Sequence, residues 1–279
     1  MKKRYWVFIG LILGGIIWIA FCGYNWGWGP FYRLHNMQTA KLEGNGLMYS
    51  IENVDKVENS YLVGHKMIFL GSSVTYGAAS QGVSFADYIG ARNDCEIIKE
   101  AVSGTTLVDD SMDSYIARMK KLDKNADIDL FVCQLSTNDA TQNKPLGKLS
   151  EDSNYDTHTV AGAIEYIISY AKTNWDCPVV FYTNPYYESE NYRMMVELLE
   201  EVAEKWDIEI INMWSDDSFN NITEEQRNLY MADAIHPTKA GYLEWWTPYI
   251  EEKIDDILRN NYKEVKFKVK HAEIVAIES

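Results

Sequence analysis

The sequence is poor in cations for its length. Only 26 of its 279 residues are Lys or Arg, against 41 Asp and Glu, and the formal net charge is −15. A surface this acidic repels the phosphate backbone of DNA or RNA. We therefore expect no nucleic acid among the partners of this chain.

Cysteine is also scarce, and its placement follows no pattern. The 4 cysteines form no C-x-x-C and no Cys/His arrangement, so neither a zinc site nor a disulfide scaffold is indicated. We expect buried free thiols at Cys22, Cys95, Cys133 and Cys177. Internal repeats and low-complexity tracts are absent as well. With 47% hydrophobic residues, the length allows one large α/β domain and a short extra segment.

A long run without charge follows three cations at the N-terminus. Lys2, Lys3 and Arg4 precede an uncharged stretch from Tyr5 to Cys22. Its length of 18 residues just reaches that of a membrane-spanning helix. Because cations mark the cytoplasmic side, the rest of the chain should lie outside the cytoplasm. We expect residues 1–23 to be an uncleaved signal-anchor of a single-pass cell-membrane protein.

Other fates of this N-terminus stay open. A cleaved signal peptide would leave a secreted protein, although small residues before a cut are lacking in Phe21-Cys22-Gly23-Tyr24. Lipoprotein processing before Cys22 is a further alternative, which the bulky Phe21 fits badly. Residues 24–64 are expected to form a linker or edge segment. This segment either carries a short strand over residues 48–51 or acts as a stalk.

Apolar runs alternate with amphipathic stretches from residue 65 onward. Strands are expected at about 67–70, 96–102, 129–135, 178–182 and 209–213. Helices are expected at about 84–90, 111–122, 159–172, 190–206, 224–229 and 239–258. Such alternation implies a parallel sheet with helices on both faces. Alternating apolar and cationic residues over 265–270 predict an edge strand within a C-terminal tail, residues 261–279.

A serine stands where the first predicted strand turns into a helix. The apolar residues 67–70 run into Gly71-Ser72-Ser73-Val74-Thr75-Tyr76-Gly77. A serine at such a corner is exposed at the rim of the sheet, and N–H groups of the helix start point at whatever binds there. This is a suitable place for a nucleophile. A glycine-rich turn with ordinary capping serines is the alternative at this point.

A candidate base and its partner follow near the other end of the chain. The imidazole follows the carboxylate by three positions in Asp233-Ala234-Ile235-His236-Pro237. A nucleophilic serine needs a base to take its proton, and the base needs a partner that fixes its tautomer. Ser73, His236 and Asp233 supply these three roles.

Two further polar corners lie between these segments, each at the end of a predicted strand. Gly104 follows the second strand, and Asn138 follows the third in Ser136-Thr137-Asn138-Asp139. Their backbone and side-chain N–H groups could bind a developing oxyanion, where a preorganised donor is worth about 3–4 kcal/mol. Ser73, Gly104 and Asn138 all fall at the carboxyl edge, where parallel sheets bind ligands.

The four segments in this order resemble the SGNH (GDSL-type) hydrolase family over about residues 65–258. The family carries Gly-Asp-Ser-x-x-x-Gly, an oxyanion glycine, Gly-x-Asn-Asp and Asp-x-x-His. The resemblance implies Ser73, Asp233 and His236 as catalytic residues, with Ser73, Gly104 and Asn138 as the oxyanion hole. Two positions depart from the pattern: Ser72 replaces the usual aspartate, which puts a supporting hydrogen bond in doubt, and Ser136 replaces a glycine.

Together the pattern and the resemblance predict an α/β fold. We expect a flavodoxin-like three-layer α/β/α sandwich with a mainly parallel five-stranded sheet in an SGNH hydrolase domain, residues 65–260, preceded by an N-terminal transmembrane helix.

The expected function is that of a serine esterase. Its substrate would be an ester, with O-acetyl groups on a cell-surface carbohydrate as one candidate, and it would need neither metal nor organic cofactor. An acyltransferase or a (lyso)phospholipid esterase could use the same residues. A protein of another class, an inactive glycan-binding surface module, is the alternative that Ser72 raises. The sequence leaves the oligomeric state open.

Overall fold

A five-stranded parallel sheet forms the centre of the protein. The computed structural model describes residues 2–26 and 32–261. All neighbouring strands run parallel, in the order β2-β1-β3-β4-β5. Their bounds are β1 Lys66–Gly71, β2 Glu96–Ala101, β3 Leu130–Gln134, β4 Val179–Tyr182 and β5 Glu209–Ile211. This is the flavodoxin-like strand order, and it confirms the predicted fold class.

Apolar residues cover both faces of the sheet, which explains the unbroken apolar runs in the sequence. Successive side chains of a strand point to opposite faces. In β1, Ile68 and Leu70 join one hydrophobic cluster, whereas Met67 and Phe69 join the other. A strand that is buried on both sides must therefore be apolar throughout.

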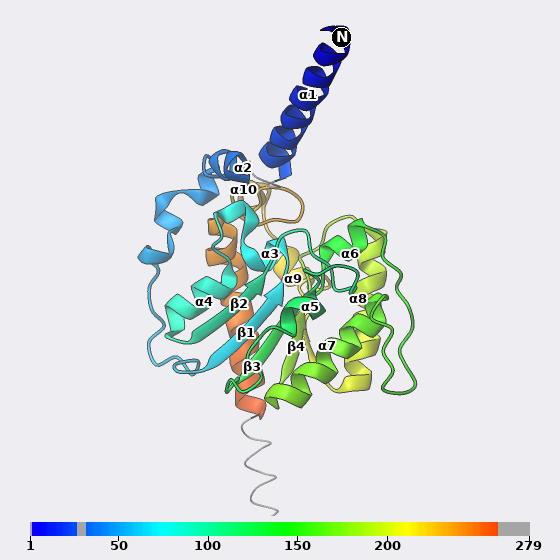
Figure 1. The fold of residues 1–279 in the computed structure, drawn as a ribbon. Helices are drawn as coiled ribbons and strands as arrows, with labels where there is room; N and C mark the ends of the chain where they lie inside the picture. The colour runs from blue at the N-terminus through cyan, green and yellow to red at the C-terminus, as the bar shows by residue number, and fades with distance from the viewer. Residues whose placement is uncertain (1, 27–31, 262–279) are drawn as a thin grey trace, which may run out of the picture.

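Helices cover both faces, so the molecule has three layers (Figure 1). One face is covered by α5 Tyr115–Met119, α7 Val160–Trp175 and α8 Glu190–Trp206. The other is covered by α4 Phe85–Asn93 and by the last helix, residues 239–261, which includes a π-helical turn at Gly241–Trp246. Shorter helices lie at the loops: α3 Ser73–Tyr76, α6 Thr137–Thr141, α9 Asp217–Asn220 and α10 Glu224–Tyr230.

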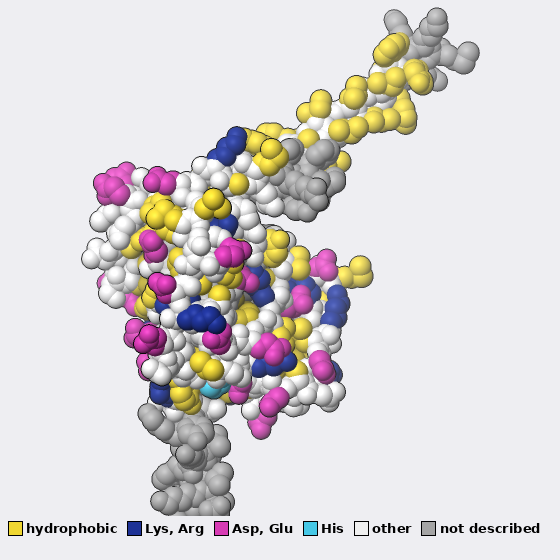
Figure 2. Space-filling view, turned by 90° about the vertical axis from the view of Figure 1, so that its left-hand side faces the viewer, with side chains coloured by type: hydrophobic (Ala, Val, Ile, Leu, Met, Phe, Trp, Pro, Cys, Tyr) yellow, Lys and Arg dark blue, Asp and Glu magenta, His cyan; other side chains and the backbone are white. Residues whose placement is uncertain are grey.

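The N-terminal helix α1, Lys2–Trp26, stands out from the body (Figure 1). Its stretch Tyr5–Tyr24 has a mean hydropathy of 2.3 and is only 11% buried, so it is long and apolar enough to cross a membrane. A signal sequence would have the same properties. Figure 2 shows hydrophobic side chains along most of this helix.

Three sequence predictions need comment. The strand expected at residues 48–51 is wrong: 3-10 turns occupy Glu43–Asn45, Leu47–Tyr49 and Ile51–Asn53, because their N–H groups bond locally, as Tyr49 does to Gly46. The helix expected at 111–122 is only Tyr115–Met119, since Ser114 caps it by accepting from the Ala117 N–H. The edge strand predicted at 265–270 lies outside the described residues.

Candidate active site

The corner after β1 is built so tightly that it requires glycine. Ser72 follows β1 with a φ of −116° and a ψ of −139°, Ser73 begins α3, and Gly77 ends α3 with a φ of 86°. A Cβ on Gly71 would come within 1.7 Å of Thr75 Oγ1, so no larger residue fits there. Ser73 thus lies in the first turn of a helix, where N–H groups have no acceptor within the helix.

Three side chains from the two ends of the domain form a continuous hydrogen-bonded chain. Ser73 Oγ lies 2.8 Å from His236 Nε2. The other ring nitrogen, Nδ1, lies 2.8 Å from Asp233 Oδ2 and 3.1 Å from Oδ1. Ser73 is buried, whereas the side chains of His236 and Asp233 are 25% and 56% exposed, so the chain runs from the interior to the surface. The structure therefore brings together the three residues that the sequence singles out.

The loop that carries Asp233 and His236 is held by its own hydrogen bonds. Asp233 Oδ1 accepts from the backbone N–H groups of Ile235 at 2.7 Å and His236 at 2.8 Å. An antiparallel bridge between Met231 and Pro237 closes the loop at its base. Partial burial would raise the pKa of Asp233, but the hydrogen bonds and charge of His236 and these N–H groups lower it to about 2. Asp233 is consequently ionised at neutral pH and can hold a proton on His236 Nδ1.

One residue that sequence reasoning missed, Gln134, supports the turn between β1 and α3 that carries Ser73. Gln134 Oε1, at the end of β3, accepts from the Ser72 N–H at 2.9 Å and from Thr75 Oγ1 at 2.8 Å. Longer contacts join the same oxygen to Ser72 Oγ at 3.3 Å and to the Thr75 N–H at 3.3 Å. Tyr242 on the last helix adds a bond from its hydroxyl to the Val74 carbonyl, at 2.6 Å. The signal in the sequence was a glutamine inside an otherwise apolar strand.

This arrangement bears on the departure at position 72. The resemblance left a supporting hydrogen bond in doubt because Ser72 replaces an aspartate. Here the Ser72 backbone and hydroxyl both bond to Gln134, which is completely buried. The turn at Ser72 is therefore supported by hydrogen bonds, and these bonds go to Gln134 on the neighbouring strand β3.

The loop after β2 and the start of α6 are joined to each other. Asn138 Nδ2 donates to the Thr105 carbonyl at 2.9 Å, next to Gly104, which is exposed and has a φ of 83°. The register pairs Gly71 with Ala101 and Leu70 with Cys133, so both loops leave the sheet beside the nucleophile corner. Gly104 and Asn138 thus lie at the same edge as Ser73.

Two polar side chains hold these loops in place. Ser136 caps α6, accepting from the N–H groups of Asn138 at 3.2 Å and Asp139 at 3.3 Å, which gives a local role to this departure from the family glycine. The Asp139 carboxylate accepts from the backbone N–H groups of Leu107 at 2.8 Å and Val108 at 3.1 Å. Burial raises the pKa of Asp139, whereas these bonds oppose that rise.

Arg118 is a second residue that sequence reasoning missed. Its guanidinium donates to the carbonyls of Gly71 and Glu100, each at 2.8 Å, and to Thr105 Oγ1 at 3.1 Å. The side chain is only 3% exposed. Arg118 therefore ties the ends of β1 and β2 to the loop that contains Gly104. A single arginine within a short amphipathic helix carries no sequence signal for this role.

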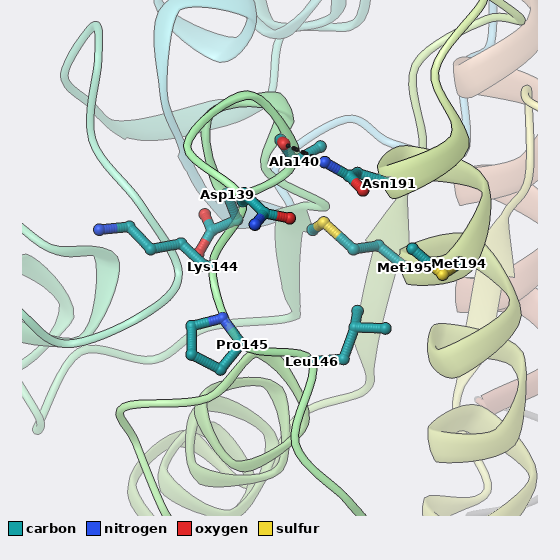
Figure 3. A pocket seen from close by; sticks show the side chains of 9 residues that line it. Asp139, Ala140, Lys144, Pro145, Leu146, Asn191, Met194 and Met195 are labelled. Atoms are coloured by element: carbon teal, nitrogen blue, oxygen red, sulfur yellow. Dashed lines mark hydrogen bonds between the residues drawn. The ribbon is translucent and has the colours of Figure 1, made fainter.

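Two hollows lie near these residues. A groove of about 580 Å³ borders Asp233; its lining includes Tyr186, Tyr187, Glu188, Arg227 and Asn228. A smaller cavity of about 250 Å³ lies between α6, the loop that follows it and α8 (Figure 3). Asp139 and Lys144 lie on one side of it, with Met194 and Met195 of α8 on the other. Of these two hollows, the groove is the one lined by a member of the hydrogen-bonded chain, Asp233.

The described residues contain no group of three or more His, Cys, Asp or Glu placed to hold a metal ion. The four cysteines are free; Cys22, Cys133 and Cys177 are buried and Cys95 is partly so.

Comparison with known proteins defines the class to which this fold and site belong. The chain is a member of the GDSL-like lipase/acylhydrolase family, which matches residues 69–243. It is thus an esterase- or lipase-like hydrolase by family, in agreement with the resemblance drawn from the sequence. No curated protein matches the chain.

Solved structures share the fold across nearly their whole length. A protein from Lactobacillus plantarum is 20% identical with a TM-score of 0.58, covering 72% of this chain and 99% of that one. A protein from Bacteroides ovatus ATCC 8483, described as a GDSL-like lipase, is 17% identical with a TM-score of 0.54, covering 69% and 99%. A lipolytic protein of the G-D-S-L family from Desulfitobacterium hafniense DCB-2 is 17% identical with a TM-score of 0.53, covering 68% and 99%. At these identities the likeness concerns the fold.

Proposed function

We propose that the protein is a serine esterase in which Ser73 is the nucleophile, His236 the general base and acid, and Asp233 its orienting partner. The observation that carries this proposal is the unbroken hydrogen-bond chain from Ser73 Oγ through both nitrogens of His236 to Asp233. An ionised Asp233 keeps the proton of a neutral imidazole on Nδ1, which leaves Nε2 free to accept the serine proton.

The reaction follows from these positions. Ser73 Oγ attacks the ester carbonyl while His236 Nε2 takes its proton, and a tetrahedral oxyanion forms. The N–H groups of Ser73 and Gly104 and the amide of Asn138 bind that oxyanion. His236 then gives the proton to the leaving alkoxide, so that an acyl-Ser73 ester and a free alcohol result. Water attacks the acyl group with His236 as base, which releases the acid and restores Ser73.

The proposed substrate is an O-acetyl ester on a cell-surface carbohydrate. The groove beside Asp233 is lined by hydroxyl, amide and charged groups as well as by aromatic rings, and Tyr186 is 56% exposed. Such a surface suits a hydrated sugar alcohol better than a long acyl chain. The domain would lie outside the cytoplasm, since α1 is proposed to be its membrane anchor.

Hydrolysis of p-nitrophenyl acetate by the full chain in detergent tests the nucleophile. We expect Ser73→Ala to lower the rate by about 10³-fold or more, because the attacking group is lost. Equal rates for both proteins would reject the mechanism. Failure of Ser73 to react with a fluorophosphonate probe would favour the glycan-binding module, and an added sugar alcohol that outcompetes water would indicate a transferase. Release of acetate from an O-acetylated polysaccharide then tests the substrate class.

A further inference from the structure

The chain that leaves the N-terminal helix is fastened to the active-site loops. Asn45 Nδ2 donates to the Thr39 carbonyl at 2.9 Å and to the Ala79 carbonyl at 2.7 Å. Its Oδ1 accepts from the Lys239 N–H at 2.8 Å. Ala79 belongs to the loop that follows Ser73, and Lys239 comes three residues after His236. The buried Asn45 therefore links the end of α2, Tyr32–Thr39, to the loop that follows Ser73 and to the segment that follows His236.

Close packing and a further hydrogen bond also attach this segment to the domain. A Cβ on Gly44 would come within 2.0 Å of the Leu229 carbonyl oxygen and 2.4 Å of Thr238 Oγ1. The backbone at Gly44 is therefore in direct contact with Leu229 and Thr238. Further along, the Tyr88 hydroxyl donates to the Tyr49 carbonyl at 2.5 Å. Residues 39–49 are thus packed on the domain, where the sequence had left open a loose stalk.

The short connection to α1 limits how far the active site can lie from a membrane. Helix α1 ends at Trp26 and α2 begins at Tyr32. A chain of this length spans at most about 20 Å when fully extended. In Figure 1 α1 rises beside α2 and α10, from the same end of the sheet as α3. If Tyr5–Tyr24 crosses a bilayer, this end of the sheet, which carries Ser73 and His236, is kept near that bilayer.

The attached segment also exposes apolar side chains. The exposed fractions are 65% for Met37, 36% for Leu42, 87% for Leu47 and 72% for Met48. Single exposed apolar residues are ordinary, but four within twelve residues beside a membrane span are not. Figure 2 shows hydrophobic side chains both along α1 and on the part of the body nearest to it. We call these four residues the apolar contact surface.

We propose that the apolar contact surface rests on the lipid bilayer and holds the active-site edge against it, so that esters carried at the membrane surface are the substrates. The bilayer is favoured as occupant because only residues 27–31 separate the apolar helix α1, which is long enough to cross a membrane, from α2, and Met37 lies on α2 itself. The statement about substrates rests on the proposed esterase function. The statement about the bilayer contact stands independently of it.

Fluorescence quenching tests the contact itself. The full chain would be reconstituted in phosphatidylcholine–phosphatidylglycerol liposomes, with a fluorophore at Met48→Cys and nitroxide-labelled lipids as quencher. The matched control is Val63→Cys, because Val63 is 58% exposed and precedes β1 at the opposite edge of the sheet. The unsubstituted chain supplies the background from the native cysteines. We expect stronger quenching at position 48; equal quenching at both positions overturns the proposal.

A pair of matched substrates tests the consequence for activity. One is a soluble fluorogenic acetyl ester, and the other is the same ester coupled to the headgroup of phosphatidylethanolamine in the liposome. The double variant Met37→Glu/Leu47→Glu should lose about tenfold or more in rate on the lipid-borne ester, because charges are repelled from the interface. Its rate on the soluble ester should change by less than about twofold, as expected for exposed positions.

The control Val63→Glu should leave both rates unchanged. An unaltered ratio of the two rates in the double variant would contradict the proposal. If the unsubstituted protein cleaves neither ester, the esterase function is rejected, and the quenching result still decides whether the surface contacts the bilayer.

Discussion

Gln134 Oε1 lies 2.8 Å from Thr75 Oγ1 and 2.9 Å from the backbone nitrogen of Ser72, so a β3 side chain shapes the corner that presents Ser73. Thr75 is bonded in turn to the Tyr182 hydroxyl of β4, at 2.6 Å. The turn that carries Ser73 is therefore held by side chains from β3 and β4. Because these groups are buried, each bond that is lost leaves a polar atom without water.

Gln134→Leu should therefore impair both stability and catalysis. Leucine accepts no hydrogen bond, so the buried N–H of Ser72 loses its acceptor, at about 1–3 kcal/mol, and the hydroxyl of Thr75 keeps only the Tyr182 hydroxyl as partner. We expect a free energy of unfolding lower by at least about 2 kcal/mol and a clearly lower kcat. Ser72→Ala is the matched comparison: it removes one long contact of 3.3 Å and should cost less than about 1 kcal/mol. Similar decreases in the free energy of unfolding for Gln134→Leu and Ser72→Ala would contradict this account.

Asp233→Asn should reduce kcat by about 10³–10⁴-fold, because an amide no longer holds the proton on Nδ1 of His236. The folded state should also become less sensitive to acid. A carboxyl whose pKa is lowered to about 2 stabilises the fold above its unfolded pKa of about 3.9, and this stability is lost as the pH falls through 2.

Thermal unfolding between pH 5 and pH 2 measures this second effect. The Tm of the unsubstituted protein should fall more steeply than that of Asp233→Asn as the pH is lowered. Parallel curves would show that the charge of Asp233 does not stabilise the fold.

Arg118 is expected to act as a positioning residue for the loop with Gly104. In Arg118→Lys the charge remains, but one ammonium group cannot reach the Gly71 carbonyl, the Glu100 carbonyl and Thr105 together. We expect kcat to fall by about 10-fold or more with a smaller change in KM, since the oxyanion donors shift while the groove is unaltered. Arg118→Met should lower both kcat and Tm further than Arg118→Lys does. A lower Tm with unchanged kcat in the Lys variant would mean a purely structural role.

Asn138→Ala tests the proposed oxyanion donor. Loss of one such donor lowers kcat by about 10²–10³-fold in serine hydrolases, because the bond strengthens as the oxyanion forms. KM should change little. Gln142→Ala, an exposed residue at the end of the same helix, is the control and should leave kcat within about twofold. A loss of affinity for substrate with unchanged kcat would argue for a role in binding instead.

Much of the architecture follows from the sequence because its causes are local. Apolar runs bounded by polar corners correctly predicted five strands within one or two residues of most ends, and the spacing of apolar residues predicted the long helices Val160–Trp175 and Glu190–Trp206. Ser73, Asp233 and His236 stand in short motifs whose chemistry depends on residue type and order. Their placement at the carboxyl edge follows from the parallel βα alternation.

The supporting residues were decided by tertiary structure alone. Gln134 reaches Thr75 across 59 positions, Arg118 reaches Gly71 across 47, and Asn45 reaches Lys239 across 194. Nothing in the local sequence of these residues indicates their partners, because the distance between two groups depends on how separate elements pack. The missing strand at residues 48–51 has the same origin: its residues bond in local turns while Tyr88 takes the Tyr49 carbonyl. Local patterns thus determined the sheet and the motif that we propose to be catalytic, and packing between distant segments decided what holds that motif in place.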